Sequence, residues 1–320
     1  MKRIGIVTSG GDAPGINAAI RAVVRMAVPH GMQVVGFEGG YCGLMADEKR
    51  PLGLRSVSGI INLGGTFLGS KRCPEFKTED ALRKAGKVFE SNKISDLIVI
   101  GGDGSFRGAL DLSRVVDVNL VGIPASIDND VYGTDETIGF DTAVNTALSA
   151  IDRIRDTAAS FNRVFVVEVM GRKRGFLALA VGLAAGAEKI LVPEVGVDLK
   201  EVCKMVLENM AKGKRSIIIV AAEGVGDSRR IAKRIERNTG SEVRLSVLGY
   251  IQRGGAPTAR SRILASLFGS KAVQLILDGS RNEVVGILND KLVSTSLKVV
   301  CKMEKPLDFE LLHLAEELAV

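Results

Sequence analysis

The residues best suited to chemistry are aspartates in two short motifs. Asp103 lies in GGDGS, Gly101–Ser105, a glycine turn of the kind that lets backbone N–H groups approach phosphate. A carboxylate there would repel phosphate unless a cation lies between them, and Mg²⁺ is the natural choice. The motif therefore predicts a site for magnesium-bound phosphate. An aspartate that caps the next helix is the alternative.

The second motif is PASIDND, Pro124–Asp130. In an extended segment Asp128 and Asp130 would point to the same side. Phosphoryl transfer to an alcohol needs one carboxylate to accept the hydroxyl proton and a second acidic group to help order the metal. An Asx-rich turn is the alternative. The position after a strand, shortly after GGDGS, favours the catalytic interpretation.

A third glycine motif, TSGGDAPG at Thr8–Gly15, stands between a strand-like and a helix-like run. It suits either a phosphate loop at a helix start or a tight turn with positive φ, and both remain open. GGDGS matches neither Walker A nor GxGxxG. Lipid and NAD kinases also use a GGDG turn, so it indicates nucleotide binding without naming the acceptor.

Arginines stand beside glycines in the second half of the chain, and separate guanidinium groups of this kind suit phosphate clamps. A surface ion pair is the alternative for any one of them. The set comprises Arg163, Met170–Arg172, Arg244 and Gly249–Gly255, which reads GYIQRGG.

The net charge is +6 and the pI about 9.1, but the basic residues are dispersed. A nucleic-acid-binding protein would more often show a basic block with interleaved aromatics. Small anionic ligands are therefore favoured over nucleic acid.

Histidine and cysteine chemistry is limited. His30 and His313 are the only histidines and lie outside the glycine motifs, which argues against a Ser/His/Asp triad or a His-ligated metal. No pair of cysteines has CxxC spacing, so zinc and dithiol chemistry are weakly supported. The cysteines are Cys42, Cys73, Cys203 and Cys301.

The 320 residues suit two domains, and no low-complexity linker marks a boundary. The apolar run near the N-terminus is too short for a secretion signal, and no stretch has membrane-spanning length. We therefore expect a cytoplasmic protein with reduced thiols and no membrane partner.

Short β-branched runs alternate with amphipathic stretches. Strands are expected at Arg3–Thr8, Gln33–Phe37, Leu97–Ile100, Asn119–Ile123, Val164–Val169 and Ile217–Ala221. Helices are expected at Asn17–Val28, Phe106–Val115, Thr142–Ala159, Phe176–Ala187 and Gly269–Leu277. This alternation predicts an α/β fold with largely parallel, Rossmann-like sheets and helices on both faces. The glycine motifs follow strands, so they should gather at the carboxyl edges of the sheets.

Taken together and in this order, the motifs resemble the bacterial ATP-dependent 6-phosphofructokinase family from Lys2 to about residue 310. That family moves the terminal phosphoryl group of Mg-ATP to the 1-hydroxyl of fructose 6-phosphate. The segments that carry the resemblance are TSGGDAPGxNAAIR, GGTFLGSxR, VIGGDGS, IDND, VEVMGR, AEG and IQRGG.

The resemblance implies catalytic roles. Asp128 would be the general base, assisted by Ser126, and Asp103 with Asp130 would organise Mg²⁺. Charge on the transferring group would be stabilised by Gly11, Arg72 and Arg172. The ATP site would be lined by Gly11, Tyr41, Arg72, Cys73, Gly102, Asp103, Gly104, Ser105 and Gly108.

The resemblance also implies how substrate and effector are held. Arg163 and Arg244 would reach fructose 6-phosphate from a neighbouring subunit, which implies a homotetramer. The other expected sugar contacts are Ser126, Asp128, Asp130, Met170, Gly171, Arg172, Glu223, Tyr250 and Arg253. A site for ADP or phosphoenolpyruvate would use Arg21, Arg25, Arg155, Glu188, Lys212 and Lys214.

Some positions depart from the family pattern. Ser126 replaces the usual Thr and keeps the hydroxyl. Tyr250 replaces the usual His of GHxQRGG; it can donate a hydrogen bond but carries no positive charge near neutral pH, so weaker binding of fructose 6-phosphate is expected. On the effector side Leu63 replaces an Arg and another Arg is shifted to Arg55, which leaves effector affinity open.

Donor choice follows from volume and charge. Pyrophosphate-dependent relatives usually carry Asp at the position of Gly104 and Lys at that of Ala125. Gly104 and Ala125 leave room for a nucleotide and favour ATP. A pyrophosphate-dependent enzyme and a catalytically silent metabolite sensor are the alternatives, although a sensor would be expected to have lost Asp128. An NAD or lipid kinase would leave IDND and QRGG unexplained.

By the same resemblance, residues 1–138 with 252–304 would form an ATP-binding domain. Residues 139–251 with 305–320 would form a fructose 6-phosphate-binding domain.

Overall fold

The computed structural model describes residues 2–319, and the chain divides into two compact units. Unit 1 comprises Met1–Thr142 and Arg253–Lys305, and unit 2 comprises Ala143–Gln252 and Pro306–Val320. Each unit is described by itself. The ligand expected of each domain stays a prediction. Among the described residues, no helix has the length and apolarity to cross a membrane.

Unit 1 is built on a seven-stranded sheet in the order β11-β10-β5-β4-β1-β2-β3. The five inner strands run parallel, and the edge strands β3 and β11 are antiparallel to their neighbours. Every residue of β4 and β5 is buried, as expected of parallel strands covered on both faces. The strands are β1 (Arg3–Ser9), β2 (Gln33–Phe37), β3 (Lys49–Leu52), β4 (Asp96–Gly101), β5 (Asn119–Pro124), β10 (Glu283–Leu288) and β11 (Lys291–Ser296).

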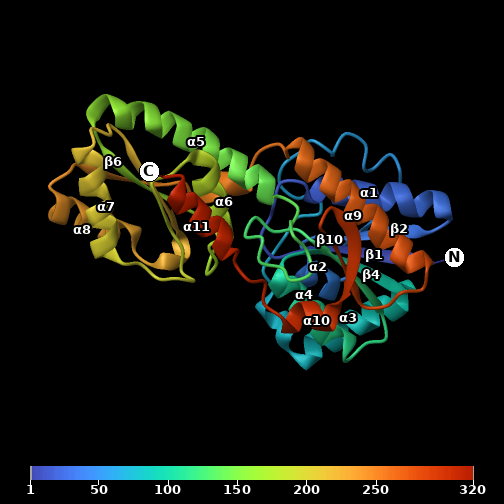
Figure 1. The fold of residues 1–320 in the computed structure, drawn as a ribbon. Coiled ribbons are helices and arrows are strands. Elements are labelled where there is room, and N and C mark those ends of the chain that lie inside the picture. Colours follow the sequence, from blue (N-terminus) through green and yellow to red (C-terminus); the bar gives the residue numbers. More distant parts are fainter. Residues whose placement is uncertain (1, 320) are drawn as a thin grey trace. The chain divides into compact units, whose positions relative to one another are not determined.

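Helices cover both faces of this sheet (Figure 1). On one face α1 (Ile16–Ala27) packs along α9 (Ala259–Leu277), and a Cβ at Gly269 would lie only 2.6 Å from that of Ala22. On the other face an apolar cluster around Phe37, Phe89 and Phe106 joins the sheet to the remaining helices. These are α2 (Tyr41–Met45), α3 (Glu79–Asn92), α4 (Asp103–Ser113) and α10 (Leu297–Lys302), with the 3₁₀ turns η1 (Val28–His30) and η2 (Pro74–Lys77) between elements.

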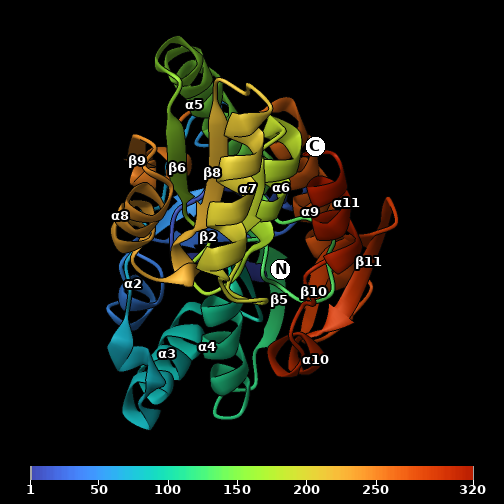
Figure 2. The same ribbon diagram turned by 60° about the vertical axis from the view of Figure 1, so that its left-hand side comes forward.

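Unit 2 has a four-stranded parallel sheet in the order β7-β8-β6-β9. Alternate residues of β8 face opposite sides of the sheet. Ile217, Ile219 and Ala221 contact α7 and α8, whereas Ile218 and Val220 face the other side. Figure 2 shows this sheet with its helices. The strands are β6 (Val164–Val169), β7 (Lys189–Leu191), β8 (Ile217–Ala222) and β9 (Val243–Val247). The helical elements are α5 (Phe140–Phe161), α6 (Phe176–Ala185), α7 (Leu199–Ala211), α8 (Ser228–Thr239), α11 (Phe309–Glu317), η3 (Glu223–Val225) and η4 (Gly249–Arg253).

The predicted α/β fold with parallel sheets is confirmed, and each expected strand and helix is present, with bounds that agree within a few residues except at the start of α9. The largest difference is in α9, which begins at Ala259 and not Gly269, because Thr258 accepts a hydrogen bond from Ser261 N and so caps the helix ten residues earlier. Helices α2, α3, α7, α10 and α11 and strands β3, β7, β9, β10 and β11 were not predicted, and neither was α8. Its sequence, SRRIAKRIERNT, offers only Ile231, Ala232 and Ile235 to the core.

Candidate functional site

Three of the motifs meet at one edge of the unit 1 sheet. The register pairs Ser9 with Gly101 and Gly101 with Pro124, so β1, β4 and β5 end at the same level. Strand β1 has β2 on one side and β4 on the other, and the crossovers diverge there. In open parallel sheets, ligands bind at such a switch point, outside the carboxyl ends of the strands.

The helices that follow these loops begin without a side-chain cap. Gly15 caps α1 and Gly102 caps α4, so no side chain occupies the first N–H groups of either helix. Elsewhere Thr78, Asp198 and Asp227 cap α3, α7 and α8 in the ordinary way. Helix starts without a capping side chain retain donors and a positive dipole end for an anion.

Glycine is required at position 101, where the loop after β1 contacts the loop after β4. Ser105 Oγ donates to the carbonyl oxygen of Ser9 at 2.8 Å, which ties the start of α4 to the end of β1. A Cβ at Gly101 would lie 2.5 Å from both of those oxygens. Only glycine fits, and the close approach fixes the two loops against each other.

Asp103 is the first residue of α4, and the cap is Gly102, so the alternative of an aspartate cap is wrong. Its carboxylate accepts a hydrogen bond from Arg107 Nε at 2.8 Å, and its side chain remains 35% exposed. This hydrogen bond also raises the pKa of Arg107. The carboxylate therefore sits at a helix start, partly neutralised and accessible.

The loop that carries Asp128 is folded back and not extended. Ala125 pairs with Ile138, and Asn129 has a φ of 52°, in the left-handed region. The Asn129 side chain accepts from Thr137 N and donates to the Asp135 carbonyl, both at 3.0 Å. The expectation that strand alternation aligns Asp128 with Asp130 is therefore wrong, because a turn separates them. Asp128 itself is only 3% exposed.

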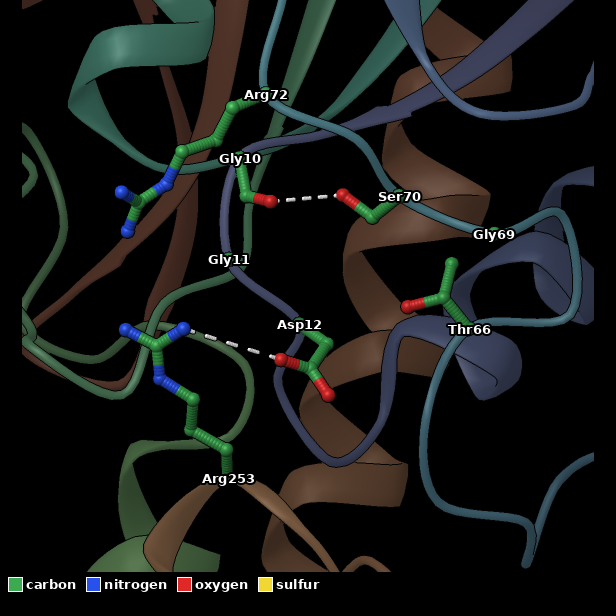
Figure 3. A pocket seen from close by; sticks show the side chains of 8 residues that line it. All are labelled: Gly10, Gly11, Asp12, Thr66, Gly69, Ser70, Arg72 and Arg253. Carbon is green, nitrogen blue, oxygen red and sulfur yellow. Dashed lines mark hydrogen bonds and ion pairs between the residues drawn. The ribbon is translucent and has the colours of Figure 1, made fainter. Parts of the chain in front are cut away.

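A cavity of about 390 Å³ lies beside the first glycine motif. Figure 3 shows Arg253 reaching toward Asp12, with the Arg72 side chain passing beside Gly10, and the two arginines come from other parts of unit 1. Arg253 Nη1 lies 4.0 Å from the Asp12 carboxylate, and Ser70 Oγ donates to the Gly10 carbonyl at 2.8 Å. Two guanidinium groups beside a glycine turn suit a phosphorylated ligand. The other lining residues are Thr66 and Gly69.

Of this lining, the sequence identified Gly11, Arg72 and Arg253 as site residues. It did not assign Thr66 or Ser70, although both stand in the GGTFLGSxR segment, where hydroxyls between glycines were an available signal.

The other residues expected around ATP differ in accessibility. Tyr41 is only 4% exposed, its hydroxyl donates to the Ser105 carbonyl at 2.6 Å, and burial raises its pKa. Tyr41 therefore supports the start of α4 from behind and offers little accessible surface to a ligand. Gly108 lies against the Tyr41 ring, where a Cβ would come within 3.1 Å. Gly104 is exposed, with nothing within 4 Å of an added Cβ.

In unit 2 the Met170–Arg172 loop and Glu223 follow the ends of β6 and β8, which pair Val169 with Ala222. Glu223 accepts a hydrogen bond from Arg172 N at 2.5 Å and holds the Met170–Arg172 loop. Met170 N donates to the side chain of Gln252 at 2.9 Å. Gln252 is fully buried and was missed, because the IQRGG motif suggested only its arginine.

Arg163 and Arg244 share one carboxylate. Arg163 Nε forms an ion pair with Glu242 at 2.8 Å, and Arg244 donates a hydrogen bond to the same carboxylate. These contacts, chiefly that with Arg163, lower the pKa of Glu242. Arg163 also lies over the Phe161 ring at 4.3 Å. Tyr250 is 80% exposed.

Three of the residues expected to bind an effector do meet. Lys214 Nζ lies 3.0 Å and Arg155 3.8 Å from the Glu188 carboxylate, whose side chain is 2% exposed. Glu188 also accepts from Ile218 N. Lys212 follows α7, while Arg21 and Arg25 lie on α1 of unit 1. The effector role of all six stays a prediction.

The fold and these loops define an α/β protein with an anion-binding edge of glycine turns, carboxylates and arginines. A model of the phosphofructokinase family matches residues 3–276. The chain is 49% identical to "ATP-dependent 6-phosphofructokinase" of Halothermothrix orenii and 51% identical to "ATP-dependent 6-phosphofructokinase 1" of Thermus thermophilus, in both cases over 100% of each chain. The chain therefore belongs to the phosphofructokinase family.

A solved structure agrees with this assignment. Phosphofructokinase from Saccharomyces cerevisiae aligns with a TM-score of 0.88 at 34% identity, over 94% of this chain. The chain spans 45% of that yeast protein's length, so it corresponds to less than half of it.

Proposed function

We propose that the chain is an ATP-dependent 6-phosphofructokinase, which converts fructose 6-phosphate and ATP into fructose 1,6-bisphosphate and ADP in glycolysis. The observation that carries the proposal is the meeting of the GGDGS and PASIDND loops on paired strands, in a chain about half identical throughout to proteins of that name. One loop suits phosphate and the other supplies a buried carboxylate.

Asp128 acts as the general base in this proposal. A sugar hydroxyl is a weak nucleophile, and a carboxylate that accepts its proton during attack accelerates the transfer. Asp128 is 3% exposed, and its backbone N–H donates to Ser126 Oγ at 3.2 Å. Ser126 thereby fixes the turn, and Asn129 fixes it from the other side. The carboxylate is held by the loop and shielded from water.

The chemistry of the donors proposed for the metal suits Mg²⁺. Asp103 and Asp130 offer carboxylate oxygens, which a hard cation prefers, and Asp103 is partly exposed at a helix start. When bound, Mg²⁺ supplies positive charge that offsets the charge of the phosphates. Arg107 keeps the Asp103 carboxylate in place through their hydrogen bond.

Gly11, Arg72 and Arg172 are proposed to stabilise the negative charge on the transferring phosphoryl group. Gly11 and Arg72 line the same cavity, and the guanidinium group of Arg253 lies near the Gly11 backbone. An arginine that contacts the phosphoryl group stabilises the charge that builds up on it in the transition state.

Nucleotide, not pyrophosphate, is the proposed donor. Gly104 opens onto free space, so an aspartate there would extend a negative charge into the volume that the nucleotide requires. Ala125 is 1% exposed and adds no charge. Gly102, Ser105, Tyr41, Cys73 and Gly108 complete the proposed ATP site.

The sugar phosphate is assigned to the arginines and to Met170, Gly171, Glu223 and Tyr250 of unit 2. Because Arg163 and Arg244 are assigned to a neighbouring subunit's substrate, we propose a homotetramer. An effector site for ADP or phosphoenolpyruvate and a cytoplasmic location complete the proposal.

The test is formation of fructose 1,6-bisphosphate from fructose 6-phosphate and Mg²⁺, with ATP and pyrophosphate supplied separately. Product with ATP alone is expected. Product with pyrophosphate alone would refute the argument from Gly104 and Ala125. No product with either would refute the enzyme assignment and favour a silent sensor.

A further inference from the structure

Two cysteines and a glutamate meet in unit 1, although no pair of cysteines has a metal-binding spacing in the sequence. Cys42 is the second residue of α2, Cys73 directly precedes η2, and Glu75 lies within η2. The two sulfur atoms and a carboxylate oxygen of Glu75 all lie within 4.8 Å of one another. Cys73 Sγ is 3.7 Å from Glu75 Oε2.

These separations suit a tetrahedral cation with soft ligands. With metal–sulfur distances of about 2.3 Å and metal–oxygen distances of about 2.0 Å, two ligand atoms lie about 3.5 to 3.8 Å apart. The Cys73–Glu75 separation already has this value, and the remaining pairs are within about 1 Å of it. Small side-chain rotations would complete three ligands of a tetrahedron.

The segments that carry the ligands are already fixed to each other. The rings of Tyr41 and Phe76 stack at 4.0 Å with an interplanar angle of 9°, which joins α2 to η2. Cys42 Sγ also lies 3.8 Å from the Arg72 carbonyl. Little backbone ordering would be needed on binding, which favours affinity.

We propose that Cys42, Cys73 and Glu75 form a binding site for a thiophilic divalent cation such as Zn²⁺ or Cd²⁺, with a fourth position open to solvent or ligand. Two thiols lose their protons to solvent as two metal–sulfur bonds form, and the carboxylate supplies the third ligand. The site is chemically distinct from the oxygen donors proposed for Mg²⁺, because thiolates select soft cations.

A disulfide switch is the competing use of the same pair. Forming a disulfide requires an oxidant, whereas cation binding requires only that the thiols release their protons. A reductant in the titration separates the two uses, because it abolishes a disulfide and leaves the thiols available to a cation.

The test is a titration of the whole protein with Cd²⁺, monitored by the ultraviolet charge-transfer absorption of cadmium thiolates. The buffer contains excess Mg²⁺ and a phosphine reductant. We expect one equivalent to bind at micromolar concentration or tighter. The Cys42→Ser/Cys73→Ser variant should lose the absorption, and Glu75→Gln should bind about tenfold more weakly, as expected when one ligand is removed.

The matched control is Cys203→Ser/Cys301→Ser, which removes the two buried cysteines elsewhere in the fold and should keep full binding. Circular dichroism and Tm identify any variant that does not fold, and each single Cys→Ser variant then serves in its place. Equal absorption in the Cys42/Cys73 variant, loss in the control, or no saturable binding would overturn the site. The site would also be overturned by a combination of two results. The protein purified without reductant would be lighter by two hydrogens, as for a disulfide, and the reduced protein would bind no cadmium.

Discussion

The two units hold their predicted ligand groups in different ways. In unit 1 the glycine turns present backbone N–H groups and short carboxylates, whose positions follow from strand register and close packing. In unit 2 the candidate groups are mostly the ends of long side chains, and several already pair with carboxylates, as Arg163 and Arg244 do with Glu242. In the proposed enzyme, unit 1 would therefore be preorganised by the fold, whereas unit 2 would exchange internal ion pairs for ligand.

This contrast predicts which kinetic parameter each unit controls. Groups fixed before the substrate binds can act on the transition state and alter kcat, whereas groups that exchange partners chiefly alter substrate affinity. The following substitutions test that division, beginning with the largest expected effect.

Asp128→Asn should lower kcat about 10³-fold to 10⁴-fold with little change in KM, because the amide cannot accept the hydroxyl proton. The measurement is steady-state kinetics with ATP and fructose 6-phosphate. Asp111→Asn is the control, since Asp111 lies on α4 and pairs only with Arg114 among the contacts observed. Full activity in Asp128→Asn would refute the assignment of the base and, with it, the catalytic role of unit 1.

Gly104→Asp should lower kcat/KM for ATP about 100-fold while leaving fructose 6-phosphate affinity unchanged. The position opens onto free space, so the variant protein should fold normally. The new carboxylate would then repel the phosphates of ATP. Direct binding of an ATP analogue measures the effect. Gly53→Asp is the control, because Gly53 is equally open and lies outside the motifs. An unchanged ATP affinity would mean that the Gly104 face of the turn does not meet the nucleotide.

Lys305 lies beside the acidic residues Asp130, Asp135 and Glu136 of unit 1, and its protonation links stability to pH. It donates to the Asp135 carbonyl at 2.8 Å, and burial lowers its pKa to about 8 although Asp135 and Asp130 act to raise it. The unfolded chain therefore holds this proton at higher pH than the folded chain does. Between pH values of about 8 and 10.5, the contribution of Lys305 to stability increases with pH.

Lys305→Met should remove that increase. From about pH 7.5 to about pH 9.5, the wild-type protein should gain roughly 2 kcal/mol relative to this variant. Thermal unfolding of both proteins at the two pH values measures the difference, with Lys302→Met, an exposed neighbour on α10, as control. Parallel pH curves for wild-type and Lys305→Met would show that the lysine stays charged in the folded state.

The sequence was most informative where backbone geometry dominates. Short β-branched runs followed by glycine turns locate β1, β4 and β5, and parallel strands bring their ends together at one edge. That reasoning needs no side-chain detail. It therefore anticipated the meeting of Gly11, Gly102 and Asp128 loops without any knowledge of the packing around them.

The sequence was least informative where the fold brings distant residues together, or where a single backbone torsion changes the direction of the chain. Asn129 adopts a left-handed conformation, and this one residue turns the Asp128–Asp130 segment away from a strand. Gln252 reaches Met170 across 82 positions of chain. Cys42 and Cys73 lie close together beside the stacked rings of Tyr41 and Phe76. No local spacing records these contacts.

The smallest predicted effect tests unit 2 most directly. Glu242→Gln removes the carboxylate that Arg163 and Arg244 share, so both guanidinium groups should be released for phosphate. The Glu242 carboxylate is exposed and its ion pairs are screened by solvent, so KM for fructose 6-phosphate should fall only about twofold to fivefold with kcat unchanged. Glu208→Gln, which removes a comparable exposed pair with Lys204, should change neither parameter. A higher KM in Glu242→Gln would mean that the carboxylate orients the arginines for substrate, and unit 2 would then be preorganised as well.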